Sequence, residues 1–179
     1  MRYLARVFAS GAAASLASAL VAALCSRLEN RHGARPINAV AHIYDGGQPP
    51  AHEGRRGRNT ALGLAIHTGA SWWWALFYEA LSERRRNLAG AAGVAAAAYV
   101  VDYHVVGERF RPGFERHLSG RAMVATYAAL AGGFVLASAL QRRLHDHQKE
   151  DRDESDEGRP AERGPEGVVA PEARRQRLA

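Results

Sequence analysis

Cysteine is nearly absent from this chain of 179 residues, which contains one, Cys25. A single cysteine cannot close an internal disulfide, and it cannot supply the Cys-x-x-Cys pairs typical of zinc and redox motifs. The sequence also lacks a phosphate-binding glycine loop and a zinc-protease motif. A nucleophile elbow is missing too, because Gly69-Ala70-Ser71 is followed by tryptophan and not by glycine. These absences leave an enzymatic activity unsupported.

Charged residues are almost missing from four stretches of about 20 residues, the length that crosses a bilayer. The stretches are residues 7–26, 60–78, 88–107 and 122–141, and Asp102 is the one charged residue within them. None of them has the polar face, repeated every three to four residues, that a soluble helical bundle requires. The sequence therefore predicts an all-α integral membrane bundle of four transmembrane helices within residues 1–144.

Large apolar side chains are scarce in residues 145–179, which carry ten acidic and seven basic residues. Such a segment buries too little apolar surface to offset its ordering entropy, so we expect a disordered charged tail. The net charge of +6 then reflects arginines that flank the apolar stretches. Because those arginines do not lie on a soluble fold with a recognisable motif, nucleic acid is not an expected partner.

The flanking charges predict a multi-pass protein of a membrane but not its orientation. Arg27, Arg31 and Arg35 directly follow the first stretch, which favours an uncleaved anchor over the alternative of a cleaved signal peptide. Ten basic residues near the stretches fall on each side of the membrane, so their distribution does not orient the chain. A charged tail that needs no translocation favours termini in the cytoplasm.

Four spans would place the segments 27–59 and 108–121 on one side of the membrane, here named side B, and both termini on side A. At 1.5 Å per residue, His67, Asp102 and Tyr127 then lie at a shared depth, roughly 8–10 Å below side B. In a helix Asp102 and His104 point about 200° apart, so we expect Asp102 to face inward and His104 to lie near the interface. A carboxylate in lipid needs a partner, and His67 or Tyr127 can supply one.

These positions define a candidate polar cluster. Its predicted members are His42, His67, Asp102, Tyr127, Tyr99 and Asn38. Three readings of the cluster stay open: a structural hydrogen-bonded pair, a site that handles protons or ions, and a metal or haem site of a membrane redox subunit that uses His42, His67 and Asp102. No cofactor is predicted, because no histidine pair has the spacing of a strong metal motif.

The two side B segments carry surface features of their own. Residues 36–44, which begin with proline and hold Asn38 and His42, predict a short interfacial helix. In residues 109–121 we expect Phe110, Phe114 and Leu118 to lie among the lipid headgroups. The arginines expected to contact lipid headgroups are Arg109, Arg111, Arg116 and Arg121.

Small residues recur every four positions in these stretches, as in membrane helices that approach each other closely. The rows are Gly11-Ser15-Ala19, Ala89-Gly93-Ala97, Ala128-Gly132 and Ala129-Gly133. They predict a compact bundle, and they are compatible with a membrane-protein partner or a homo-oligomer beside the lipid bilayer itself. The protein would then be a non-catalytic assembly partner.

Four segments carry a family resemblance: INAVAHIYDG, AIHTGASWWWALFYE, AYVVDYHVV and ERFRPGFERHLSGRAMVATYAAL. Over roughly residues 37–135 the chain resembles a group of small bacterial four-helix inner-membrane proteins without an assigned activity. The resemblance implies the bacterial cytoplasmic (inner) membrane and supplies no catalytic residue or cofactor.

Overall fold

The computed structural model describes residues 2–46, 56–81 and 83–157, and in these ranges the chain is helical apart from short connecting turns, with no strand. The long helices are α1 (Arg2–Asn30), α4 (Arg56–Ala80), α5 (Leu88–Val100) and α6 (Gly120–Glu157). The short ones are α2 (Arg35–Val40), α3 (His42–Asp45), the 3₁₀ turns η1 (Glu83–Arg85), η3 (Glu108–Phe110) and η4 (Phe114–Arg116), and the π-helical turn η2 (Val101–Val105). The chain divides into two compact units, Met1–Arg143 and Leu144–Ala179, and the architecture below is that of the first.

Three helical segments are long and apolar enough to cross a membrane: Tyr3–Asn30, Leu88–Val105 and Gly120–Lys149. They correspond to the first, third and fourth stretches predicted from the sequence. Helix α4, which contains the second predicted stretch, is also long, with 25 residues, but it is not one of these three apolar segments.

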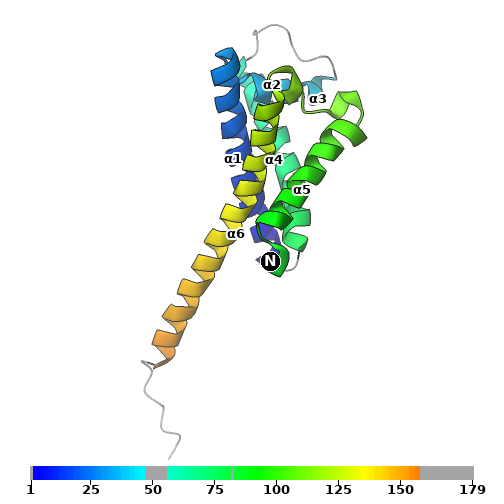
Figure 1. Cartoon of the computed structure of the whole chain (residues 1–179). Helices are drawn as coiled ribbons and strands as arrows, with labels where there is room; N and C mark the ends of the chain where they lie inside the picture. The colour runs from blue at the N-terminus through cyan, green and yellow to red at the C-terminus, as the bar shows by residue number, and fades with distance from the viewer. Residues whose placement is uncertain (1, 47–55, 82, 158–179) are drawn as a thin grey trace, which may run out of the picture. The chain divides into compact units, whose positions relative to one another are not determined.

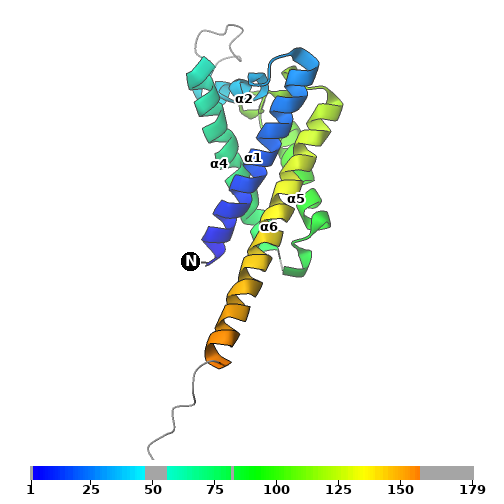
Figure 2. The ribbon, with the colours of Figure 1, turned by 90° about the vertical axis from the view of Figure 1, so that its left-hand side faces the viewer.

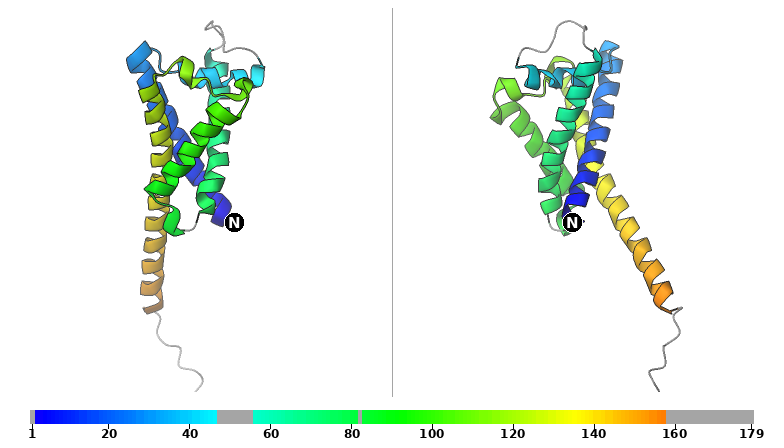
Figure 3. Two further views of the ribbon diagram at one scale, coloured as in Figure 1. Left: turned by 45° about the vertical axis from the view of Figure 1, so that its right-hand side comes forward. Right: turned by 180° about the vertical axis from the view of Figure 1, so that it is seen from behind.

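The first unit is a helical bundle in which α1 packs against both α4 and α6. Figure 2 shows α1 crossing α4, and Figure 3 shows α1 crossing α6, while α5 is inclined to the others. Helices α2 and α3 lie across the side B end, where α1 ends and α4 begins (Figure 1). Short helices therefore occupy the predicted interfacial segment, and α2 packs against both α1 and α4.

Small residues allow the closest helix contacts in this bundle. Gly11, Ser15 and Ala19 of α1 are all buried, and a Cβ on Gly133 of α6 would overlap the backbone of Ala14. Two of the four predicted rows thus lie at helix interfaces. The other two, Ala89-Gly93-Ala97 and Ala128-Gly132, are exposed on the surface of the unit.

Helix α6 continues to Glu157, so the prediction of disorder from residue 145 is corrected for residues 145–157. The sequence after Leu140 contains no glycine or proline before Gly158 and is rich in Gln, Arg, Lys and Glu, which favour helix. Extending a formed helix also avoids the cost of a new nucleus. The predicted tail at residues 158–179 lies outside the described residues.

Candidate functional site

A small polar cavity lies inside the bundle in the half nearer side B. Its volume is about 40 Å³, and a water molecule requires about 10–15 Å³ by the same kind of measure. The cavity is lined by Ser18, His67, Ala70, Ser71, Asp102, Phe114, Thr126, Tyr127 and Leu130. Three residues of the predicted cluster, His67, Asp102 and Tyr127, therefore share one cavity although they come from three different helices.

Asp102 is held by a direct hydrogen bond. The hydroxyl of Tyr127 on α6 donates to its Oδ2 atom at 2.7 Å. Asp102 lies in η2, where the Val106 amide donates to the Val101 carbonyl at 2.9 Å, a π-type bond across five residues. Such turns widen a helix by one residue and occur frequently at functional sites. The AYVVDYHVV segment thus changes its helical register where its carboxylate meets the cavity.

His67 faces the same cavity from α4 and pairs with a different helix. Its Nε2 atom lies 3.0 Å from the Ser18 hydroxyl of α1, and its ring centroid lies 5.9 Å from that of Phe114. Two ionisable groups therefore line one small cavity, each with its own hydroxyl partner. This arrangement can hold and exchange a proton, or hold a bridging water molecule.

Aromatic rings enclose Asp102 on the α5 side. The Tyr99 ring meets the Tyr127 ring edge to face at 5.4 Å and the His104 ring at 5.8 Å. Tyr103 contacts both tyrosines, and its hydroxyl lies 3.9 Å from the sulfur of Met123. His104 itself is exposed. Tyr99 therefore belongs to the surroundings of the cavity and not to its lining.

His42 and Asn38 lie apart from the cavity lining. His42 is buried, and its Nδ1–H donates to the Ala39 carbonyl within the α2–α3 segment at 2.5 Å. Asn38 accepts a hydrogen bond from the Thr60 hydroxyl at 2.6 Å, which ties α2 to α4. In the part of the chain that the structure describes, no three His, Cys, Asp or Glu side chains are grouped to hold a metal ion.

The side B segment 109–121 is more buried than its sequence predicts. Phe114 and Leu118 pack inside the protein with exposed fractions of 3% and 6%, while Phe110 is exposed. Their expected place among the headgroups is wrong for these two residues because α2 lies over this end of the bundle and offers them an apolar surface, including Ile37 and Val40.

The four arginines expected to contact headgroups differ in their exposure. Arg109, Arg116 and Arg121 are exposed, whereas Arg111 is half-buried. Burial, and then the positive charges of Arg35 and Arg116, lower the pKa of the neighbouring His117 imidazole below its ordinary value. Side B therefore presents a positively charged surface to whatever lies beside it.

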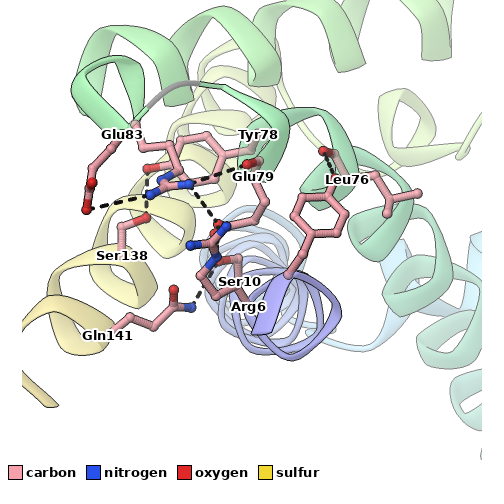
Figure 4. A network of polar contacts seen from close by, with 10 residues as sticks. Arg6, Ser10, Leu76, Tyr78, Glu79, Glu83, Ser138 and Gln141 are labelled. Atoms are coloured by element: carbon pink, nitrogen blue, oxygen red, sulfur yellow. Dashed lines mark hydrogen bonds and ion pairs between the residues drawn. The ribbon is translucent and has the colours of Figure 1, made fainter. Parts of the chain in front are cut away.

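A second polar cluster lies toward side A and is centred on Glu79, whose side chain is fully buried (Figure 4). The hydroxyl of Ser10 donates to Glu79 Oε1 at 2.5 Å. The Nε atom of Arg6 and the Nη1 atom of Arg86 lie 3.4 and 3.7 Å from Glu79 Oε2. This cluster links α1, α4 and the turn that precedes α5.

Sequence reasoning identified neither the burial of Glu79 nor its pairing with Arg6. In the sequence, Glu79 lies at the end of a predicted span, shortly before Arg84, Arg85 and Arg86. This position predicts pairing with those arginines, and it accounts for the contact with Arg86 alone. The signal that could have identified this pairing is the position of Arg6 and Ser10 near the start of α1. Two antiparallel helices place the start of one beside the end of the other, so these residues lie level with the end of α4.

Serines of α1 form a buried row against α4. Ser10 contacts Glu79, Ser15 lies 2.9 Å from the hydroxyl of Thr68, and Ser18 pairs with His67. Hydroxyl contacts of this kind join helices in membranes. The row therefore gives the α1–α4 interface a polar seam that reaches from the Glu79 cluster to the cavity.

Comparison of the chain with protein-family models, with curated proteins and with solved structures found no match. The function is therefore inferred from the arrangement of the side chains, and the family resemblance stays an expectation from the sequence.

Proposed function

We propose that the chain is a multi-pass protein of the bacterial cytoplasmic membrane, crossed by α1, α4, α5 and α6, and that its polar cavity is a proton-binding site. The observation that supports the cavity's role is that Asp102 and His67, from different helices, line one small cavity large enough for a water molecule. Ionisable groups within a membrane are costly and often mark proton relays.

The outward surface of the bundle supports four spans. Large apolar side chains are exposed on every long helix, including Leu20 on α1, Trp73 and Phe77 on α4, and Val124 on α6, with exposed fractions of 61%, 57%, 47% and 71%. Lipid accommodates such a surface, whereas in water it would drive association. The 25 residues of α4 exceed the roughly 20 that a bilayer requires.

Cysteine labelling tests whether α4 crosses the membrane. Two variants in a Cys25→Ser background carry one exposed thiol each. Tyr44→Cys places it before the start of α4, and Arg84→Cys places it after the end of α4. We expect a membrane-impermeant maleimide added to intact cells to label one of the two variants, because the two ends of α4 lie on opposite sides. Lysed cells are the control and should allow labelling of both. Equal labelling in intact cells would show that α4 does not cross.

Infrared difference spectroscopy tests the proton-binding site. Between mildly acidic and mildly alkaline buffer, the wild-type protein in membranes should show a carboxyl band whose change disappears in Asp102→Asn. Tyr127→Phe should shift that band, because the mutation removes the hydroxyl that donates to Asp102. If the wild type and Asp102→Asn titrate alike, the carboxyl keeps one protonation state, and the Asp102–Tyr127 pair is a structural contact.

A metal-binding or redox role has less support from the geometry. His67 and Asp102 face the cavity, but the imidazole of His42 donates its Nδ1–H to a backbone carbonyl outside it. Stoichiometric metal, or a haem absorption band, that is present in the purified wild type and lost in His67→Ala would favour the redox alternative over proton binding.

A further inference from the structure

A groove runs between α4 and α5 toward side A, outside the polar cavity. Its volume is about 510 Å³, within the range of roughly 300–1,000 Å³ that is usual for small-molecule sites. The α4 wall includes Trp74 and Phe77, with Leu81 just beyond the end of the helix, and the α5 wall includes Gly93 and Ala97. The walls are mostly apolar, and the small residues of α5 leave its backbone accessible.

The charged end of the groove is formed by η1 and the first turn of α5. Arg85 and Asn87 line it. The Asn87 side chain is already engaged, because it accepts a hydrogen bond from the Gly90 amide at 3.0 Å and donates to the Arg84 carbonyl at 3.3 Å. Arg85 is exposed, and it is therefore the group in the groove that can bind an anion.

The three consecutive arginines after α4 have different surroundings. Arg86 turns inward to Glu79, with 11% of its side chain exposed. Arg85 lines the groove, and Arg84 is exposed and does not line it. A Cβ on Gly90 would overlap the Arg85 carbonyl, so η1 packs directly on the start of α5. The positive end of the α5 dipole thus lies beside Arg85.

We propose that this groove binds one anionic phospholipid, with its phosphate on Arg85 and the amino-terminal end of α5 and an acyl chain between α4 and α5. A guanidinium group binds phosphate through paired, charge-assisted hydrogen bonds. The apolar walls suit a hydrocarbon chain, and the single cation at one end fixes the direction of the lipid. The inference rests on the proposed membrane location but not on the proton-binding role.

Native mass spectrometry of the full-length protein in detergent tests this proposal. The probes are phosphatidylglycerol and phosphatidylcholine with identical acyl chains. The wild type should retain one phosphatidylglycerol in preference to phosphatidylcholine. Arg85→Gln should weaken retention of phosphatidylglycerol about tenfold, as the loss of a charge-assisted contact predicts. Arg84→Gln, a change of the same charge on the adjacent residue, should behave as the wild type.

A second variant tests the acyl-chain half of the groove. A Cβ on Gly93 has no atom within 4 Å, so Gly93→Leu should fold and fill the groove, and retention of both lipids should fall.

Equal lipid retention by the two arginine variants, or no headgroup preference in the wild type, would overturn the site. If Gly93→Leu converts a dimer to a monomer without changing lipid retention, a second copy of the chain occupies the groove instead. A chain that labels as a four-span protein yet shows no lipid preference would refute the lipid site alone.

Discussion

Replacing Glu79 with alanine should lower the free energy of unfolding by about 3 kcal/mol, because it leaves buried cationic and hydroxyl groups without their acceptor. The carboxylate is fully buried. Its Oε1 atom accepts the Ser10 hydroxyl, and its Oε2 atom forms ion pairs, without a hydrogen bond, with Arg6 and Arg86. Arg86, with 11% of its side chain exposed, cannot regain full hydration in place. Arg6, at 39%, can do so in part, which holds the expected loss at the lower end of the range for a broken buried ion pair. Equilibrium unfolding in mixed micelles, followed by tryptophan fluorescence, measures the change.

Glu83 provides the matched control for this experiment. It contacts the same Arg86 at 3.9 Å, but 78% of its side chain is exposed. Exposed ion pairs contribute about 0–1 kcal/mol, so Glu83→Ala should be nearly neutral. Glu79→Gln should lie between the two, because its amide oxygen can still accept the Ser10 hydroxyl. Equal losses for Glu79→Ala and Glu83→Ala would show that the buried network does not stabilise the bundle.

Substituting Gly133 with alanine should cost about 2–3 kcal/mol through overpacking at the crossing of α1 and α6. The added Cβ would lie 2.7 Å from both the Ala13 carbonyl oxygen and the Ala14 amide nitrogen. Backbone atoms cannot move aside as a flexible side chain can, so one helix must shift. The same unfolding assay should report the loss, together with a changed environment for the tryptophans on α4, which packs against α1.

Gly132→Ala is the internal control for the helix crossing. Gly132 is the adjacent residue on the same helix, and its Cβ would have no atom within 4 Å. Alanine favours helix over glycine by about 1 kcal/mol, so this variant should match the wild type or exceed it in stability. Similar losses in the two variants would show that α1 and α6 do not approach as closely as the structure describes.

Much of the fold could be predicted from uncharged runs of about 20 residues, because an apolar run of that length favours one long helix. The helices α1, α5 and α6 contain the predicted stretches 7–26, 88–107 and 122–141 in whole or in large part. Their ends were less predictable, because helical hydrogen bonding continues beyond the apolar window. In α1 it includes Arg2 and Asn30, and in α6 it extends to Glu157.

The position of the candidate site along the helices could be predicted from the sequence, but its contacts could not. Rise per residue placed His67, Asp102 and Tyr127 at one level, and these three residues line the cavity. The π turn at Val101–Val105 has no signal that periodicity could detect, because a single extra residue changes the register only locally. The separate position of His42 also depends on how α2 and α3 fold over side B, which the sequence of that segment does not specify.

The sequence by itself determined that this chain is helical and how far along each long helix each polar group lies, because composition and rise per residue act locally along one helix. Only the tertiary structure decided the partners: Tyr127 for Asp102, Ser18 for His67, and Ser10, Arg6 and Arg86 for Glu79. Those pairings join residues far apart in the sequence, such as Ser10 and Glu79, which are 69 positions apart. They depend on which helix faces which, and this is set by close contacts such as that of Gly133 with Ala14.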